Sequence, residues 1–353
     1  MIVMKIYKNT TKENNKSMKE YTTDVLIVGA GPVGLFANYQ AGFLGMKTIV
    51  VDALDEIGGQ LSALYPYKYI YDIPGFTKIL AKDLVSNLYE QASQFNKEYL
   101  LKRHITNLVS NEDGSYSVHS SLNDVIHCKA IVLAAGAGAF GPNVPPIEGI
   151  ESYHNKSVFY FVKNPDDFKD KTIVIAGGGD SAVDWAIGLS SVAKKIYVIH
   201  RRNQFRAAQS TVDQMYDLAK TGNIELVIPY QLDRLIGNNG MLESVVVKTL
   251  SGEEKIIEAN CLLPLFGLSR SLGALEKWGF TINKMHSSID VSPNTLETKL
   301  KGIYAVGDVA SYEHKIKLIT VGFAESASAV HMAWKYVFPN KVFHFVHSTS
   351  SKE

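Results

Sequence analysis

The sequence predicts an α/β protein with two Rossmann-like dinucleotide-binding domains. Three observations carry this prediction. The first is a repeat: a strand, a glycine-rich loop, a helix and a second strand follow one another from residue 23 and again from residue 171. The second is the length, because 353 residues are enough for about two domains of ordinary size. The third is a hydrophobic content of 46%, which allows each domain to bury a core.

The first repeat begins at residues 23–34, TDVLIVGAGPVG. Residues 25–28 form a short apolar run, which is typical of a strand buried on both faces. Residues 35–44 then predict a helix, and residues 47–52 (KTIVVD) predict a second strand rich in β-branched side chains. Elements in this order form a βαβ unit, so the two strands are expected to be parallel.

The loop of this unit carries Gly29, Gly31 and Gly34 as G-x-G-x-x-G. The first glycine permits a tight turn, the second lets the backbone approach a pyrophosphate, and the third lets the helix pack closely on the strand. Asp52 ends the second strand, where a carboxylate can accept hydrogen bonds from ribose hydroxyls. We interpret this unit as a dinucleotide site suited to an unphosphorylated ribose such as that of FAD. The alternative is an ordinary glycine turn.

The second repeat begins at residues 171–182, KTIVIAGGGDSA. A helix is expected over residues 183–192, and residues 195–200 (KIYVIH) predict the second strand. The loop is the variant G-x-G-x-x-A, formed by Gly177, Gly179 and Ala182.

The end of this second unit differs from the first. Where the first unit has Asp52, the second has His200, followed by Arg201 and Arg202 and then by Arg206. A carboxylate at this position would repel a 2′-phosphate, whereas guanidinium groups bind one through charge-assisted hydrogen bonds. The second site is therefore predicted to prefer NADP(H) over NAD(H). The alternative is a solvated basic turn after a strand.

Further segments complete the predicted organisation. Residues 130–136 and 302–308 each combine a strand with a glycine, and residues 243–257 predict a hairpin. The proline-rich stretch 142–149 and residues 263–267 are expected to be the two crossovers between the domains. Asp308 follows a strand, so its carboxylate could receive the ribityl hydroxyls of FAD, although Gly-Asp is also a common turn.

Composition excludes several classes of protein. With 36 Lys and Arg against 35 Asp and Glu, the formal charge of +1 lacks the basic excess of a nucleic-acid binder. The two cysteines, Cys128 and Cys261, are far apart in the sequence and form no C-x-x-C pair, which excludes a disulfide scaffold, a four-Cys zinc site, a Cys-ligated iron–sulfur cluster and a local dithiol. No 18 consecutive residues are apolar, so neither a transmembrane helix nor a membrane partner is expected.

The first 20 residues are polar and lack the apolar core of a signal peptide. We expect residues 1–20 to be a flexible tail, with Met18 as an alternative start, and we expect the protein to be cytoplasmic. No metal site is expected, because His344 and His347 lack further nearby ligands.

Several motifs together resemble a known family. They are GAGPVG at residues 29–34, GGQL at 58–61, GGGDSAVDWA at 177–186, HRRNQFRA at 200–207 and GIYAVGDVA at 302–310. From residue 21 onward the chain resembles the thioredoxin reductase-like pyridine nucleotide–disulfide oxidoreductases. The resemblance implies three-layer (ββα) domains of the FAD/NAD(P)-binding disulfide oxidoreductase fold. Residues 21–150 and 268–353 would bind FAD, and residues 151–267 would bind NADP(H).

One departure from that family decides the subgroup. Thioredoxin reductases carry C-x-x-C just before the second glycine loop, whereas residues 157–171 here contain no cysteine. Without the redox dithiol, the chain resembles the thioredoxin reductase-like (type 2) ferredoxin–NADP(+) reductases of bacteria, which carry a C-terminal extension over the flavin. Residues 347–350 (HSTS) match that extension, and residues 64–76 (LYPYKYIYDIPGF) match the flavin region.

The resemblance also implies the residues of both cofactor sites. Contacts with FAD are expected from Gly29, Gly31, Val33, Gly34, Asp52, Gln60, Tyr65, Ile105, Phe140, Asp308, His347 and Thr349. Tyr65 and His347 would lie on opposite faces of the flavin. Contacts with NADP(H) are expected from Gly177, Gly179, Asp180, Ser181, Ala182, His200, Arg201, Arg202 and Arg206.

The activity implied is that of a flavoprotein that transfers electrons between NADP(H) and ferredoxin, an iron–sulfur protein, through FAD. Hydride would pass between the nicotinamide and the flavin, electrons would pass singly to ferredoxin, and no side-chain acid or base would be required. A homodimer is also implied. The alternatives are another acceptor (a quinone, a ferric complex or a low-molecular-weight disulfide) and a slow flavin redox sensor. Relatives that reduce bacillithiol disulfide carry Cys where this chain has Val33, which argues against that acceptor.

Overall fold

The structure is a computed structural model. It describes residues 18–344 apart from 96 and 284–286, together with residues 347 and 349. The chain divides into two compact units. Unit 1 comprises the chain up to Ile57, Leu88–Gly136 and the part from Leu272 onward, and unit 2 comprises Gly58–Asn87 and Ala137–Ser271.

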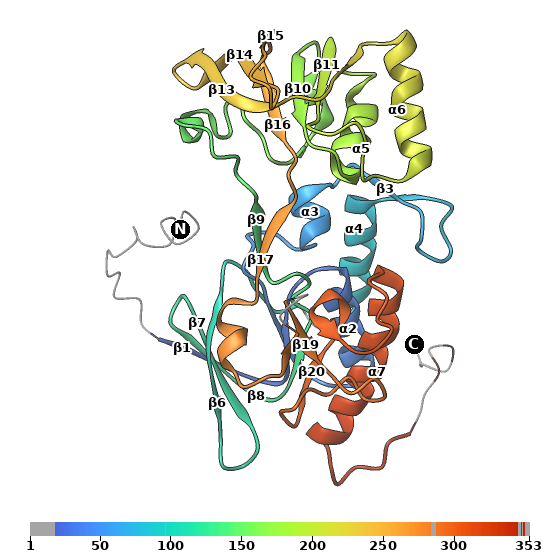
Figure 1. Ribbon diagram of the computed structural model, residues 1–353. Coiled ribbons are helices and arrows are strands. Elements are labelled where there is room, and N and C mark those ends of the chain that lie inside the picture. The colour runs from blue at the N-terminus through green and yellow to red at the C-terminus, as the bar shows by residue number, and fades with distance from the viewer. Residues whose placement is uncertain (1–17, 96, 284–286, 345–346, 348, 350–353) are drawn as a thin grey trace. The chain divides into compact units, whose positions relative to one another are not determined.

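A mainly parallel sheet forms the centre of unit 1 (Figure 1). Its strands are β1 (Lys19–Val28), β2 (Thr48–Val51), β5 (Tyr99–Leu100), β6 (Ile105–Ser110), β7 (Tyr116–Ser120), β8 (Asp124–Leu133) and β20 (Ile303–Ala305). Strands β5, β2, β1 and β8 lie in this order and are parallel, and β20 pairs in parallel with the second half of β8. The first half of β8 pairs antiparallel with β7, which pairs with β6. Strand β8 therefore belongs to two layers.

Alternate residues of β1 face different layers of unit 1. Val25 and Ile27 pack with helices α2 (Pro32–Phe43) and α7 (Ile319–Val337), which lie side by side on one face of the sheet (Figure 1). Leu26 and Val28 pack on the opposite face, with the β6–β7 meander. This alternation is the period of a strand buried on both faces, and it produces three layers.

Unit 2 repeats this construction. Its parallel sheet has the order β12 (Ile224–Val227), β11 (Lys195–Ile199), β10 (Thr172–Ala176) and β16 (Cys261–Pro264). Ile173 and Ile175 of β10 pack with α5 (Asp180–Leu189) and α6 (Gln209–Thr221). Val174 and Ala176 face the antiparallel sheet of β13 (Gln231–Asn238), β14 (Met241–Lys248) and β15 (Glu254–Glu258).

Shorter elements complete both units. Unit 2 also contains α3 (Gln60–Leu64), the pair β3 (Tyr69–Ile70) and β4 (Ile79–Leu80), and the pair β9 (Ala139–Pro142) and β17 (Leu268–Ser271). It holds η1 (Ile150–Tyr153) and η2 (Pro165–Phe168) as well. Unit 1 contains β18 (Ile282–Asn283), β19 (Ser288–Asp290), β21 (Ala310–Ser311), η3 (Gly273–Lys277) and η4 (Gly307–Val309). Helix α4 (Ala81–Ala92) contributes residues to both units.

The predicted fold class is confirmed, with both βαβ repeats and the hairpin over residues 243–257 in place. The expectation of a flexible tail over residues 1–20 is wrong at its end, because Lys19 and Glu20 pair with Asp124 and Val125 in the sheet. Residues 1–17 lie outside the described residues.

The two units divide the chain at other points than the predicted cofactor domains, chiefly because residues 58–87 group with unit 2. One cause lies in a side chain: Lys68 forms an ion pair with Asp184 of α5 at 2.8 Å and lies 5.3 Å from the centre of the Trp185 ring. The predicted crossover 142–149 falls largely after β9, and the predicted crossover 263–267 covers the end of β16 and the residues between β16 and β17. The assignment of FAD and NADP(H) to residues 21–150, 268–353 and 151–267 stays a prediction.

Candidate functional site

The first glycine loop follows β1 in unit 1 and has no room for a side chain at Gly29 or Gly34. A Cβ on Gly29 would lie 2.3 Å from the carbonyl oxygen of Ala134, and the φ of Gly29 is +113°. A Cβ on Gly34 would lie 1.9 Å from the carbonyl oxygen of Gly29. Pro32 occupies the first turn of α2, and the N-cap is Gly31, which has no side chain to cap the helix. The N–H groups of this turn are therefore left for an anion.

Asp52 lies directly after β2, at the carboxyl edge of the same parallel sheet. Its Oδ2 accepts a hydrogen bond from the N–H of Ala30 at 2.6 Å, and its Oδ1 accepts one from the N–H of Leu54 at 2.8 Å. Burial raises the pKa of Asp52, and these two hydrogen bonds offset part of the rise. Each carboxylate oxygen keeps a further lone pair, so the residue fits a ribose diol beside the glycine loop.

Two further predicted residues of unit 1 lie at this edge. Asp308 is half-buried in η4, directly after β20, which is parallel to β8 and β1. Ile105 begins β6, and the backbone just before it is tied to the end of β2, because the Arg103 N–H donates to the Asp52 carbonyl at 2.9 Å. Unit 1 thus brings the glycine loop, Asp52, Ile105 and Asp308 to the carboxyl ends of its parallel strands. Ligands of open α/β sheets bind at this edge.

The other residues predicted to contact FAD lie in unit 2 or near the end of the chain. Gln60 begins α3, and Tyr65 ends it and packs against the core beneath α5 and α6. Phe140 lies in β9, opposite Arg270 of β17. His347 and Thr349 are exposed.

The second glycine loop follows β10 in unit 2. A Cβ on Gly177 would lie 2.6 Å from the carbonyl oxygen of Leu265 and 3.1 Å from the Cβ of Ala182. Gly179 is the N-cap of α5, and Asp180 and Ser181 are exposed in its first turn. Asp180 also accepts a hydrogen bond from the N–H of Ala208 at 3.1 Å, which ties the loop to the start of α6.

His200 packs against this loop. Its ring stacks on Phe205 with the ring centres 5.0 Å apart, and its Nε2 lies 3.2 Å from the carbonyl oxygen of Gln204. A Cβ on Gly178 would lie 2.2 Å from the His200 ring, so a larger residue there would displace this ring. Burial, together with the nearby arginines, lowers the pKa of His200 below its ordinary value, although the Gln204 carbonyl acts in the opposite direction. This lowered pKa favours the neutral form of the His200 imidazole.

Arg201, Arg202 and Arg206 surround His200 and are exposed. Within the part of the chain that the structure describes, none of the three is held in an ion pair. The N–H of Arg206 donates to the Gly178 carbonyl at 2.6 Å, which ties the arginine segment to the glycine loop. The guanidinium groups are thus available to a phosphate beside the loop.

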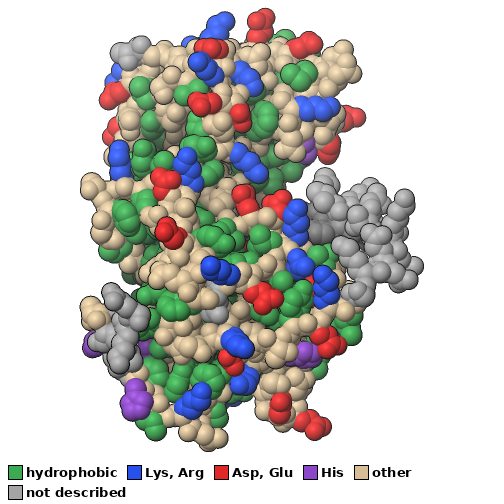
Figure 2. All heavy atoms as spheres, turned by 180° about the vertical axis from the view of Figure 1, so that it is seen from behind, with side chains coloured by type: hydrophobic (Ala, Val, Ile, Leu, Met, Phe, Trp, Pro, Cys, Tyr) green, Lys and Arg blue, Asp and Glu red, His purple; other side chains and the backbone are tan. Residues whose placement is uncertain are grey.

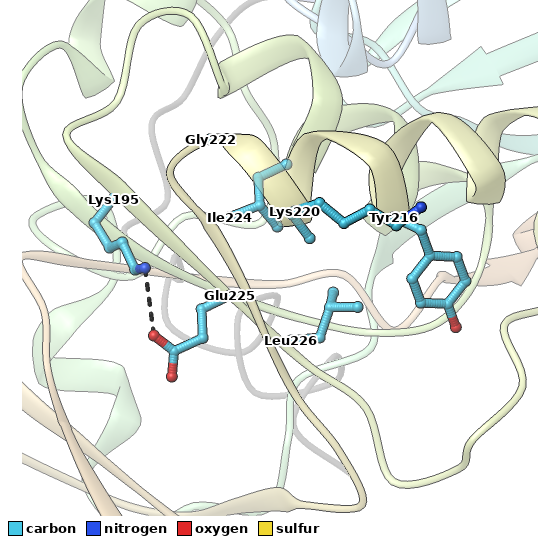
Figure 3. A pocket seen from close by; sticks show the side chains of 8 residues that line it. Lys195, Tyr216, Lys220, Gly222, Ile224, Glu225 and Leu226 are labelled. Carbon is cyan, nitrogen blue, oxygen red and sulfur yellow. Dashed lines mark ion pairs between the residues drawn. The ribbon is translucent and has the colours of Figure 1, made fainter.

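A hollow of about 430 Å³ opens elsewhere in unit 2 (Figure 3). It is lined by Lys195, Tyr216, Ala219, Lys220, Gly222, Ile224, Glu225 and Leu226. Lys195 and Ile224 begin β11 and β12, so the hollow lies at the amino ends of the parallel strands, at the opposite edge of the sheet from the glycine loop that follows β10. Glu225 is paired with Lys195 at 3.3 Å and with Lys255 at 3.1 Å. None of the predicted site residues lines this hollow.

The surface charge is mixed. On the face shown in Figure 2, lysine and arginine side chains are interspersed with aspartate and glutamate side chains. Among the described residues, no helix combines the length and the apolar character needed to cross a membrane.

Neither cysteine has the surroundings of a reactive thiol. Cys128 of β8 and Cys261 of β16 are free and buried, and they lie in different units. Burial raises the pKa of Cys128 to about 12 and also raises the pKa of Cys261. The attacking form of a thiol is the thiolate, which is scarce below the pKa.

We therefore expect the native protein at pH 8 to release less than about 0.1 equivalent of thionitrobenzoate from Ellman's reagent within minutes. About two equivalents should appear once guanidinium chloride unfolds the chain. Rapid release of one equivalent from the native protein would contradict the burial of that thiol.

Sequence reasoning missed the part that α7 plays beside the first glycine loop. The Ser326 hydroxyl donates a hydrogen bond to the Val33 carbonyl at 3.1 Å, and the buried Glu325 accepts one from the N–H of Gly307 at 2.7 Å. The available signal was a glutamate within the small, apolar run of residues 322–330. A buried carboxylate needs partners, and such a position is rare.

Comparison with known proteins places these features in a family. The model of the pyridine nucleotide-disulphide oxidoreductase family matches residues 23–326. Among curated proteins, ferredoxin–NADP reductase of Rickettsia prowazekii is 51% identical over 333 residues, covering 94% of this chain and 99% of the relative. The ferredoxin–NADP reductase of Rickettsia bellii is 52% identical over 330 residues, covering 94% of this chain and 98% of the relative.

Solved structures show the same fold at lower identity. Thioredoxin reductase of Lactococcus lactis matches with a TM-score of 0.75 and 24% identity, covering 90% of this chain and 99% of that one. Bacillithiol disulfide reductase of Bacillus cereus matches with a TM-score of 0.70 and 17% identity, covering 89% of this chain and 99% of that one. These likenesses concern the fold alone.

Proposed function

The chain belongs to the pyridine nucleotide-disulphide oxidoreductase family, and on this premise we propose that it is a flavoprotein that transfers electrons between NADP(H) and a ferredoxin through FAD. One observation carries this proposal. Relatives named ferredoxin–NADP reductase are 51% identical to this chain over 94% of its length and over nearly all of their own. The enzyme is accordingly a ferredoxin–NADP(+) reductase.

The residues of unit 1 fit the adenosine and ribityl parts of FAD. Gly29, Gly31, Val33 and Gly34 would hold the pyrophosphate at the start of α2, Asp52 the ribose, and Asp308 the ribityl hydroxyls. FAD, when bound, supplies a group that exchanges a hydride with the nicotinamide and passes electrons singly to an iron–sulfur centre.

The remaining FAD contacts belong to the same proposal. Ile105 would lie by the adenine, Gln60 and Phe140 would contact the cofactor, and Tyr65 and His347 would cover the two flavin faces, with Thr349 beside the latter. The work of these side chains is to bind, orient and exclude water. No proton transfer by a side chain is needed.

The residues of unit 2 fit NADP(H). Gly179 leaves open space for the pyrophosphate, Gly177 and Ala182 allow the loop to pack closely, and Asp180 and Ser181 lie in the first turn of α5. Arg201, Arg202 and Arg206 would bind the 2′-phosphate, and His200 would hold the arginine segment against the loop.

The absence of a paired thiol favours a one-electron acceptor. A thioredoxin reductase passes electrons through a dithiol, whereas Cys128 and Cys261 are buried in different units. The proposal includes a homodimer in the cytoplasm, as the resemblance of the whole chain implies.

An absorbance titration of the purified protein tests the cofactors. We expect flavin bands near 450 nm that bleach with about one equivalent of NADPH and only with a large excess of NADH. In steady state, reduction of cytochrome c should depend strictly on added ferredoxin, with a turnover of about 1 to 1000 per second.

Three contrary outcomes would each contradict a different part of the proposal. A protein without flavin bands, or with equal response to both coenzymes, would contradict the cofactor assignment. Ferredoxin-independent reduction of quinones or ferric complexes would indicate another acceptor. Turnover below about 0.1 per second with every ferredoxin tested would indicate a redox sensor.

A further inference from the structure

A buried ion pair lies at the start of α7 in unit 1. The side chains of Glu325 and Lys315 are each 6% exposed, and the Lys315 ammonium donates to Glu325 Oε1. The same oxygen accepts a hydrogen bond from the Tyr312 hydroxyl at 2.5 Å. The other oxygen, Oε2, accepts the backbone N–H of Gly307 at 2.7 Å. The carboxylate thus has donors on both oxygens.

The partners of Glu325 explain how a charge is tolerated at this depth. An isolated buried carboxylate is costly, and a neighbouring ammonium group with good hydrogen bonds repays that cost. Burial raises the pKa of Tyr312, and the hydrogen bond to Glu325 raises it further, so the phenol remains a donor. Removing either charge would leave the other buried without compensation.

The group held by Glu325 is the turn that presents Asp308. Gly307 has a φ of +72° and begins η4, two residues after the end of β20, and Asp308 is the next residue of η4. A Cβ on Gly307 would lie 3.3 Å from the side chain of Val33. The turn therefore packs directly on the first glycine loop.

One helical turn of α7 contacts both of these segments. Besides Glu325 on the Gly307 N–H, Ser326 donates to the Val33 carbonyl at 3.1 Å. A Cβ on Gly322 would lie 2.5 Å from the Val33 side chain, so the helix approaches the glycine loop closely. The loop predicted to hold the pyrophosphate and the turn predicted to hold the ribityl chain are thus fixed to a common element.

We propose that Glu325, with Lys315 and Tyr312 as its partners, is a positioning residue for FAD. It sets the Gly307–Asp308 turn against the glycine loop, so that both segments meet one cofactor without rearrangement. This inference rests on the proposed function, because it requires FAD in unit 1. It predicts that FAD affinity and the reduction potential of the bound flavin depend on an ion pair that makes no predicted contact with the cofactor.

The test measures FAD binding to the deflavinated full chain, by quenching of FAD fluorescence, for Glu325→Gln, Lys315→Met and the double variant. Each single variant should raise the Kd for FAD at least about tenfold, within the range of coupling between sites. The double variant should recover part of this loss, because it leaves no lone buried charge. The midpoint potential of the flavin should shift in the single variants and return toward the wild-type value in the double variant.

Glu297 supplies a matched control. Its carboxylate accepts the N–H of Gly302 at 2.9 Å and the ammonium of Lys301 at 3.0 Å, but Lys301 is 81% exposed. Glu297→Gln therefore removes another carboxylate that accepts a glycine N–H and a lysine ammonium. This carboxylate lies before β20, whereas Glu325 holds the Gly307 turn after β20. We expect this variant to leave the Kd for FAD within about twofold of the wild type.

If Glu325→Gln does not fold, Tyr312→Phe keeps the ion pair and removes only one donor, and it should still weaken FAD binding about tenfold. A lower unfolding temperature of the apoprotein with unchanged Kd and potential would overturn the proposal, since the pair would then be only structural. A double variant no better than either single variant would overturn it as well. Failure of the wild-type protein to bind FAD would contradict the proposed function itself.

Discussion

Replacing Arg201 and Arg202 together by alanine is expected to raise the KM for NADPH about a hundredfold and to leave the KM for NADH within about twofold. Both guanidinium groups are exposed and follow β11 beside the second glycine loop. A hydrogen bond to a charged group contributes about 1.5–3 kcal/mol, so each arginine accounts for roughly a factor of ten or more. NADH has no 2′-phosphate and loses nothing. Steady-state kinetics with both coenzymes, using ferricyanide as acceptor, measures the difference.

Arg234 offers the control for this experiment. It lies on β13 of the same unit and is already engaged, with Asp233 at 2.7 Å and Glu254 at 3.0 Å. Arg234→Ala removes the same charge from unit 2 and should not change either KM. Equal increases for NADPH and NADH in the double variant would remove the phosphate assignment.

Gly29→Ala is expected to abolish the binding of FAD and to destabilise unit 1 by about 3 kcal/mol. An alanine at a φ of +113° is strained, and its Cβ would lie 2.3 Å from the Ala134 carbonyl oxygen. Backbone cannot move aside as a flexible side chain can, so the loop must shift away from the end of β8. The flavin absorbance per chain after desalting, and urea unfolding followed by circular dichroism, measure the two effects.

Gly45 separates the two causes. Its φ is +73°, but a Cβ there would meet nothing within 4 Å. Gly45→Ala therefore carries backbone strain alone, costs about 1 kcal/mol and should leave the flavin content unchanged. If Gly29→Ala kept a full complement of FAD, the close approach of the loop to Ala134 would not be needed for the site.

The parts of the fold that the sequence predicts well are those encoded by neighbouring residues. Gly29, Gly34 and Asp52 lie within one βαβ unit, and the structure places Asp52 in contact with the loop through Ala30. The same holds for Gly177, whose N–H donates to the Ile199 carbonyl at 3.1 Å, and for His200, whose ring lies against Gly178. Each motif contains its own strand, turn and helix signals, so local patterns suffice.

The parts that the sequence does not predict depend on distant partners. Lys19 and Glu20 look like the end of a polar tail, yet they extend β1 because Asp124 and Val125 offer a strand edge. Residues 58–87 include Gln60 and Tyr65, which we predict to contact the flavin, but they group with unit 2, partly through the ion pair of Lys68 with Asp184. Glu325 accepts a hydrogen bond from Gly307, 18 residues earlier in the sequence, and Ser326 donates one to Val33, 293 residues earlier. No local sequence pattern predicts either contact.

The late position of β20 and α7 in the sequence affects how unit 1 can fold during synthesis. β20 pairs with β8 and α7 covers β1, but both are synthesised after residue 300, long after the strands they join. The apolar residues Val25, Ile27 and Val132 therefore lack part of their final cover until α7 has been synthesised and has left the ribosome. During that interval these strands are candidates for chaperone binding or aggregation, while the parallel sheet of unit 2 is already complete at Pro264. FAD, if it is held by both the first glycine loop and the Gly307 turn as we propose, can bind only after α7 has been translated.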